Sequence, residues 1–189
     1  MNLHGKKIGI LIESDYYEPE IWYYKFRFAE EGAEVVFLSK LWGQPGIEFK
    51  GHEFRAPFYC DHTFENMSDA DLAAYAAIIV PAGMVSDRLR WTPDVSVLPD
   101  AVKFLQRAFA NKKILKGIIC HGLWLVASAP ELVRDRRLVV HNNLIGDARN
   151  MGAIYTDQDV VVDGDLVTAR TGGHCHQFAR TIIDMMAAR

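Results

Sequence analysis

Short runs of β-branched residues alternate with helix-forming segments along this 189-residue chain, and this alternation restricts the fold more than any other feature. Residues 7–13 form an apolar run typical of a buried strand, residues 19–32 predict a helix, and residues 33–39 predict a second strand. Pro19 suits the first turn of that helix, and Gly32 suits the position just past its end. A strand–helix–strand order of this kind indicates a right-handed βαβ unit.

The same alternation continues to the end of the chain. The remaining predicted elements are a peripheral hairpin over residues 46–58, a helix capped by Ser68, a strand that ends at Val80, an amphipathic helix over 98–113, a strand over 115–120 with a helix after it, a hairpin over 159–170 that turns at Asp163-Gly164, and a closing helix over 176–188. This order predicts an α/β fold with a doubly wound, mainly parallel sheet and helices on both faces. No repeat, low-complexity tract or linker interrupts it, so we expect one domain over residues 1–189.

Charge and composition exclude several classes of partner. The formal net charge is −3 and no run of Lys or Arg forms a stripe, which argues against nucleic acid or an anionic membrane as a partner. The apolar run near the N-terminus is too short for a signal peptide, and no stretch approaches the ~18 apolar residues that cross a bilayer. Three cysteines in a chain of this size suggest a reducing compartment rather than a disulfide framework. We therefore expect a cytoplasmic protein.

Cys120 stands at an abrupt change of pattern. The residues before it are apolar and β-branched, and Gly122 and apolar residues at helical spacing follow it. Reactive residues in open α/β sheets gather just beyond the carboxyl ends of the strands, where Cys120 falls. The positive end of the following helix would favour a thiolate over a thiol. The pattern matches only half of the Gly-x-Ser-x-Gly nucleophile turn, because Ile118 occupies the first glycine position.

An isolated cysteine is more often a buried structural residue, but three observations favour a reactive one here. Residues 80–83 end a neighbouring strand and offer backbone N–H groups as oxyanion donors. Glu20 lies at the start of the first helix, beyond the end of the first strand, within reach of the same crevice. His121 supplies an imidazole beside the thiol. We therefore interpret Cys120 as a reactive thiol.

Three segments, "GIICHG", "IIVPAGM" and "EPEIWYYKFRFAEEGAEV", are similar to the signatures of the ThiJ/PfpI family, within the class I glutamine amidotransferase-like superfamily. The resemblance covers nearly the whole chain and implies a flavodoxin-like fold. It implies that Cys120 is the nucleophile, that His121 is its neighbouring histidine, and that Glu20, twelve residues before Gly32, hydrogen-bonds the cysteine. It also implies an oxyanion hole from the backbone of Gly83 and His121.

The resemblance leaves three histidines in competition for the role of base. "VVHNNLIGDARNMGA" is similar to the family segment that brings another side chain to the cysteine, which implies a role for His141. A core histidine bonded to backbone is an equally good interpretation of His141. His174 lies in the general place of a catalytic histidine in the amidotransferase relatives, so it is a rival to His121. We rank His121 first, His174 second and His141 third.

Departures from the family pattern line the same crevice and leave the substrate open. Ala82 stands where members often have glycine, and Leu123 stands where they often have proline. The loop after the last strand contains the unusual triplet His174, Cys175 and His176. This triplet lacks the paired Cys-x-x-Cys spacing of zinc sites, so we expect neither a metal nor another cofactor.

Other prominent residues have structural interpretations. We interpret Cys60 and Cys175 as packing or peripheral thiols, and Glu18 as a solvated first-turn carboxylate that complements the helix dipole. The first helix carries more aromatic side chains than one buried stripe requires, namely Trp22, Tyr23, Tyr24, Phe26 and Phe28. We assign the surplus to a subunit interface, because the family that the chain resembles forms dimers or higher oligomers.

The resemblance implies an enzyme that uses Cys120 on a small electrophilic substrate. Hydrolysis, hydration and glyoxalase-like or deglycase-like conversion of a 2-oxoaldehyde all begin with attack on a C=O carbon, so all three stay open. A protonated Glu20 that donates a hydrogen bond would keep the sulfur anionic. One alternative is a non-enzymatic redox-sensing or oxidative-stress protein in which Cys120 is oxidised. A further alternative is an intracellular cysteine peptidase. The three histidines favour turnover over sensing.

Overall fold

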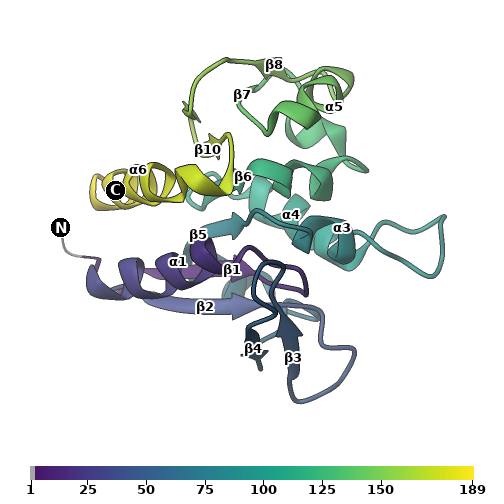
Figure 1. The fold of residues 1–189 in the computed structure, drawn as a ribbon, viewed down its shortest axis with the longest axis vertical. Coiled ribbons are helices and arrows are strands. Elements are labelled where there is room, and N and C mark those ends of the chain that lie inside the picture. Colours follow the sequence, from purple (N-terminus) through teal and green to yellow (C-terminus); the bar gives the residue numbers. More distant parts are fainter. Residues whose placement is uncertain (1–2) are drawn as a thin grey trace.

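The computed structural model describes residues 3–189 and has at its centre a six-stranded sheet flanked by helices, as predicted (Figure 1). The strands of this sheet are β1 (Lys7–Leu11), β2 (Glu34–Leu38), β5 (Tyr75–Val80), β6 (Leu115–Ile119), β9 (Val160–Asp163) and β10 (Leu166–Ala169). The helices are α1 (Glu18–Glu30), α2 (Asp69–Ala73), α3 (Val85–Leu89), α4 (Asp100–Ala110), α5 (Ile145–Asn150) and α6 (Cys175–Ala187). Two small two-stranded sheets pair β3 (Ile47–Lys50) with β4 (Pro57–Cys60), and β7 (Arg137–Leu138) with β8 (Ile154–Tyr155).

The strand order is β2-β1-β5-β6-β10-β9, and every pair is parallel except β10 with β9. The carboxyl ends of the parallel strands therefore meet at one edge of the sheet, which confirms the predicted fold class. The turn between β9 and β10 differs from the prediction by one residue. Asp163 pairs with Leu166 and belongs to the strand, so Gly164 and Asp165 form the turn. Gly164 has φ +60°, a conformation that glycine adopts readily.

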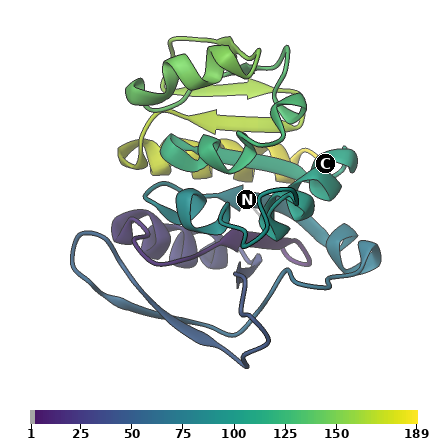
Figure 2. The ribbon, with the colours of Figure 1, turned by 90° about the vertical axis from the view of Figure 1, so that its right-hand side faces the viewer.

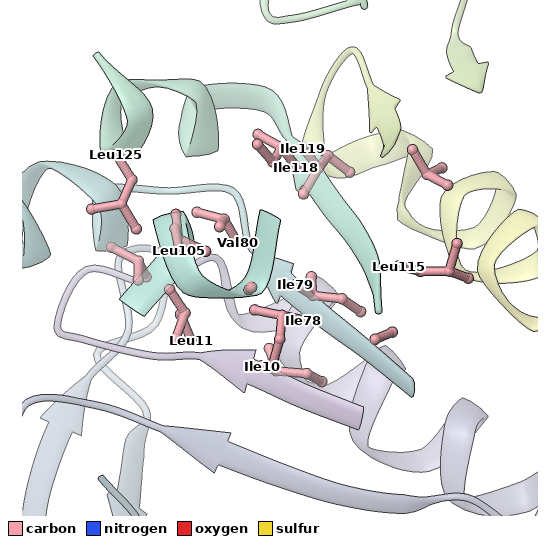
Figure 3. Close-up of a cluster of buried hydrophobic side chains, with 14 of the residues drawn as sticks. Ile10, Leu11, Ile78, Ile79, Val80, Leu105, Leu115, Ile118, Ile119 and Leu125 are labelled. Atoms are coloured by element: carbon pink, nitrogen blue, oxygen red, sulfur yellow. The ribbon is translucent and has the colours of Figure 1, made fainter. Parts of the chain in front are cut away.

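Helices cover both faces of the sheet, and the long helices α1, α4 and α6 each have a set of buried apolar side chains. Helices α1 and α6 pack together, with the Tyr24 ring 6.0 Å from the Phe178 ring. The Cα of Gly117 in β6 faces α6, since a Cβ there would lie 2.7 Å from Phe178. Figure 3 shows Leu105 of α4 near Leu11 and Val80 of the strands, away from α6. The side chains of Leu11, Val80, Leu105 and Phe178 are buried. Burial of each one stabilises the fold by about 1.5–3 kcal/mol relative to leaving it exposed.

The segment after β6 is helical but differs in type from the predicted helix. It is a 3-10 helix, η1 (Cys120–Val126), rather than an α-helix. The short elements α3, α5, β7 and β8 have no counterpart in the sequence prediction, because two to six residues carry too little periodicity. Within residues 3–189, none of the helices combines the length and the apolar character that crossing a membrane requires.

The β3–β4 hairpin confirms the predicted one and lies at the opposite end of the molecule from α5, as both views show (Figures 1 and 2). Glu18 holds its tip: the carboxylate accepts hydrogen bonds of 2.8 Å from the backbone N–H groups of Glu53 and Phe54. Glu18 is 2% exposed, so its interpretation as a solvated carboxylate is wrong. Gly51 allows this approach, since a Cβ at that position would lie 2.0 Å from the Glu18 carboxylate.

Candidate functional site

A pocket of about 350 Å³ opens at the carboxyl edge of the sheet. It gathers residues from the β1–α1 loop, the hairpin tip, the loop after β5, the turn after β6, the segment before α5 and the loop after β10. The lining residues are Tyr17, His52, Glu53, Ala82, Gly83, Met84, Cys120, His121, His141, Thr171, Gly172 and Gly173. A concave site with few polar groups, placed where parallel strands end, is where α/β proteins bind small ligands.

Cys120 sits on a strained turn at the floor of this pocket. Its φ is +58°, in the left-handed region that costs a side-chain-bearing residue about 1–3 kcal/mol. Gly122 permits the turn, because a Cβ there would lie 2.8 Å from the carbonyl oxygen of Val80. The buried Ser86 hydroxyl donates a 2.7 Å hydrogen bond to the carbonyl of His121 and ties the turn to α3. The surroundings therefore hold the thiol in one position, as in a nucleophile turn.

The structure brings three of the predicted site residues together. Sγ of Cys120 lies 3.2 Å from Nδ1 of His121, within hydrogen-bond distance for sulfur. The His121 ring packs edge-on against Trp124, with ring centroids 4.9 Å apart. The His141 ring lies 4.7 Å from the His121 ring. Nδ1 of His141 accepts a 3.2 Å hydrogen bond from the N–H of Asn143, so a neutral His141 carries its proton on Nε2.

The resting charges of this pair differ from the sequence prediction. Burial raises the pKa of the Cys120 thiol to about 11, although the N–H groups of Gly172 and His121 lower it. Burial lowers the pKa of His121, and the charge of a protonated His141 lowers it further. At neutral pH the site therefore holds a thiol and a neutral imidazole, and the prediction of a resting thiolate is wrong. The loss of hydration outweighs the backbone dipoles at this buried sulfur.

Glu20 lies behind the pocket wall rather than in the lining. It is wholly buried, and its Oε2 accepts a 2.9 Å hydrogen bond from the N–H of Ala82. Burial raises its pKa to about 8, so the carboxyl group is protonated at neutral pH, as we expected. An ionised Glu20 would raise the pKa of both Cys120 and Cys175, which places the carboxyl group near both sulfurs. The polar contacts of the described residues include no direct Glu20–Cys120 hydrogen bond, and that pairing stays a prediction.

Gly83 and His121 line the same pocket as Cys120, and backbone N–H groups beside a nucleophile can serve as oxyanion donors. Gly83 has φ +81°, and a Cβ there would lie 2.6 Å from the carbonyl oxygen of Asp15. Only glycine fits this approach without a shift of the backbone. The role of the two N–H groups as oxyanion donors stays a prediction. Gly172, whose N–H acts on the sulfur, is a further donor that the sequence analysis missed.

His174 does not line the pocket. Its Nδ1 lies 2.8 Å from the Thr171 hydroxyl, and its Nε2 lies 3.4 Å from a carboxylate oxygen of Asp159. The 3-10 turn η4 (Gly172–His174) after β10 directs the imidazole to these partners rather than to Cys120. In residues 3–189 no three His, Cys, Asp or Glu side chains form a group that could hold a metal ion.

Tyr17, His52, Glu53 and Thr171 line the pocket and were not identified from the sequence. Tyr17 and Thr171 each follow a predicted strand closely, so the strand-end rule could have found them. His52 and Glu53 carried no such signal, since their hairpin was predicted to be peripheral. Long-range contacts bring the hairpin to the pocket, among them a 2.9 Å hydrogen bond from the N–H of His52 to the carbonyl of Tyr16.

Comparison with known proteins agrees with this fold. The chain belongs to the DJ-1/PfpI family, whose model matches residues 6–185, and this confirms the resemblance to ThiJ/PfpI proteins. The protein/nucleic acid deglycase 2 of Escherichia coli K12 is 32% identical over 185 residues, which cover 97% of this chain and 99% of the relative. The deglycase PfpI of Pyrococcus furiosus is 26% identical over 180 residues, 95% of this chain and 99% of the relative.

A solved structure shares the same architecture. It is a two-domain protein of Anabaena variabilis with a DJ-1/ThiJ/PfpI-like domain and a ferritin-like domain. It superposes with a TM-score of 0.83 at 27% sequence identity, over 96% of this chain and 48% of that one. The chain thus spans about half of that protein, which has a second domain. Relatives of this chain include proteins named as enzymes.

Proposed function

We propose that this chain is a cysteine-dependent enzyme that removes small 2-oxoaldehyde adducts from amino or thiol groups. The observation that carries the proposal is the 3.2 Å contact between Sγ of Cys120 and Nδ1 of His121, on a strained turn in a pocket of about 350 Å³. The names of the deglycases from Escherichia coli and Pyrococcus furiosus support this reaction class.

The reaction begins from the neutral pair. The C–N or C–S bond of the carbinol adduct breaks as its hydroxyl group becomes an aldehyde carbonyl, and the released amine or thiol takes the hydroxyl proton. His121 accepts the thiol proton through Nδ1 while Sγ forms a bond to this aldehyde carbon, and His121 then returns the proton to the aldehyde oxygen. The N–H groups of Gly83 and His121 stabilise the substrate oxygen that gains negative charge. His121 can act as the base at neutral pH because its lowered pKa keeps the imidazole unprotonated.

The second half of the reaction balances without an external oxidant. The hydrogen on the sulfur-bonded carbon moves to the neighbouring carbonyl carbon through an enediol, so the first carbon is oxidised to a thioester and the second is reduced to an alcohol. Water then cleaves the thioester, which releases a 2-hydroxy acid and restores the Cys120 thiol. His121 can serve again as the base for water.

The alternatives from the sequence have weaker support. Oxidation acts on the thiolate, and the raised pKa of Cys120 disfavours that form at neutral pH, which argues against a redox sensor. A pocket of about 350 Å³ suits a small adduct better than an extended peptide, which argues against a peptidase.

The test uses the hemithioacetal of methylglyoxal with N-acetylcysteine and the methylglyoxal adduct of N-acetyllysine. The wild-type protein should release the free thiol or amine together with lactate, and Cys120→Ala should abolish both products. Cys60→Ala is the matched control, because Cys60 is buried, is not among the residues that line the pocket, and donates its S–H to backbone carbonyls. Lactate formation that survives in Cys120→Ala would overturn the proposal.

A further inference from the structure

Thr171 joins the Cys120 pocket to a pair of residues outside it. Thr171 lines the pocket, and its Oγ1 lies 2.8 Å from Nδ1 of His174. The other ring nitrogen of His174 lies 3.4 Å from Oδ1 of Asp159. Three groups therefore stand in a row: a carboxylate, an imidazole and a hydroxyl that belongs to a pocket residue. None of the roles assigned to the site so far uses this row.

The chemistry of the three groups sets the direction of the hydrogen bond between Thr171 and His174. An ionised carboxylate only accepts hydrogen bonds, so Asp159 favours the tautomer of neutral His174 that carries its proton on Nε2. Nδ1 is then an acceptor, and the Thr171 hydroxyl must donate to it. The hydroxyl oxygen has two lone pairs left, so toward any other partner it acts as an acceptor.

Asp159 is itself held in place. Nε of Arg170 lies 3.5 Å from its Oδ1, and the N–H of Arg170 donates to its carbonyl oxygen at 3.0 Å. Arg170 also contacts Asp157 at 2.5 Å, so the segment that carries Asp159 is tied to the end of β10. The row is therefore attached to the same strand that carries Thr171 into the pocket.

We infer that Thr171 is a substrate-binding residue, fixed as a hydrogen-bond acceptor by Asp159 and His174, and that it receives the hydroxyl hydrogen of a carbinol adduct. The inference rests on the proposed function for the identity of the substrate. The adduct of a 2-oxoaldehyde with an amine or thiol has one hydroxyl donor next to a carbonyl acceptor. The Gly83 and His121 N–H groups would take the oxygen acceptor, and Thr171 would take the donor. His174 acts through Thr171 and is a positioning residue, not the base for Cys120.

The first experiment compares two substrates at pH 8 across matched variants. The N-acetylcysteine hemithioacetal of methylglyoxal has the hydroxyl donor, and p-nitrophenyl acetate has none. Thr171→Val should lower kcat/KM for the hemithioacetal about tenfold, the worth of one hydrogen bond, and leave the acetate ester unchanged. Thr171→Ser should restore activity. Thr181→Val is the control, since Thr181 lies in α6 and is not among the residues that line the pocket. Equal losses on both substrates, or no loss in Thr171→Val, would overturn the inference.

His174 is tested by the ratio of kcat/KM for the hemithioacetal to kcat/KM for p-nitrophenyl acetate. His174→Ala should lower it, because the hydroxyl hydrogen of Thr171 is then free to rotate into the pocket. His174→Asn should restore part of it, because the amide oxygen can accept from Thr171 in the place of Nδ1. A loss that is the same for both substrates in His174→Ala, with no recovery in His174→Asn, would show a merely structural role and contradict the assignment.

A second experiment separates this inference from the proposed function. Cys120 is alkylated with iodoacetamide, which has N–H donors, and with chloroacetone, which has none. Thr171→Val should lower the iodoacetamide rate relative to the chloroacetone rate several-fold, whether or not the protein turns over any adduct. If the wild type is inactive on the adducts but this ratio falls, the proposed function is wrong and the acceptor role of Thr171 holds. An unchanged ratio contradicts the acceptor role.

Discussion

At the scale of single residues, the charge states of Cys120 and His121 matter more than their proximity. Cys120 is buried and His121 is half-buried, which favours the neutral form of each, and the thiol proton lies where the imidazole can take it. Direct contact between adjacent residues is possible because the positive φ of Cys120 turns its side chain toward the His121 ring. The pair is therefore poised for proton transfer during attack rather than for a standing thiolate.

His141 should tune the base. A protonated His141 lowers the pKa of His121, after the larger effect of burial. In His141→Asn the pKa of His121 should rise, so the acid limb of the kcat/KM profile should move to higher pH. We expect a clear loss of activity near pH 5.5 and little change at pH 8, where both proteins hold a neutral His121. His62→Gln, at an exposed position, is the control. An acid limb that stays in place in His141→Asn would contradict this coupling.

Glu20 should make the protein less stable as the pH rises. Its pKa in the folded state is about 8, above the ordinary 4.5, because it is fully buried. The folded state therefore keeps a proton that the unfolded chain loses, and the free energy of unfolding should fall by ~1 kcal/mol per pH unit between about pH 5 and 8. Glu20→Gln should remove most of this slope in urea unfolding measured across that range.

Glu18→Gln is the matched control for Glu20→Gln. Burial acts to raise the pKa of Glu18, but the N–H groups of Glu53 and Phe54 outweigh it and lower the pKa overall. The Glu18 carboxylate therefore stabilises the fold above its ordinary pKa of 4.5, and its loss should destabilise the protein at neutral pH without removing the slope between pH 5 and 8. If the free energy of unfolding changed with pH equally in the wild type and in Glu20→Gln, the protonated state assigned to Glu20 would be wrong.

At the scale of elements, the loop between β5 and α3 has no room for one additional methyl group at Gly83. Gly83→Ala would place a Cβ 2.6 Å from the Asp15 carbonyl at a φ of +81°. The loop must then shift, so we expect a loss of about 1–3 kcal/mol in unfolding free energy and at least about a hundredfold loss in kcat as an oxyanion donor moves.

Gly146→Ala is the control for Gly83→Ala, because a Cβ at Gly146 meets nothing within 4 Å and lies in α5. It should leave kcat unchanged and stabilise the helix slightly. The measurements are thermal unfolding and steady-state kinetics on the hemithioacetal. Full activity in Gly83→Ala would show that this loop takes no part in the reaction.

At the scale of the whole molecule, the two edges of the sheet have different roles. The carboxyl edge carries the pocket, whereas the amino end of β6 carries Lys116, which is 1% exposed and forms an ion pair with Asp165. Arg136 contacts the same carboxylate at 3.0 Å. Breaking a buried ion pair of this kind costs several kcal/mol. This end of the sheet therefore stabilises the fold, and the opposite end carries the pocket.

The aromatic surplus of α1 bears on assembly, which we propose is a homodimer or higher oligomer. Tyr24 and Phe28 belong to the core, but Phe26 is 64% exposed and stacks on Trp22 with ring centroids 6.1 Å apart. Phe26→Glu should therefore reduce the molar mass in sedimentation velocity to that of a monomer, while Phe54→Glu, at another exposed aromatic position, should not. The same mass for the wild type and both variants would rule out an interface at this face.

The sequence by itself determined the alternation of strands and helices, the parallel sheet and the turn at Cys120. These follow from local periodicity and from the rule that parallel strands end at one edge. Only the tertiary structure decided that His174 turns to Thr171, that Glu18 holds a hairpin at the pocket, and that Cys120 rests as a thiol. Side-chain direction and desolvation depend on what packs against a residue from distant parts of the chain, and no local pattern contains that information.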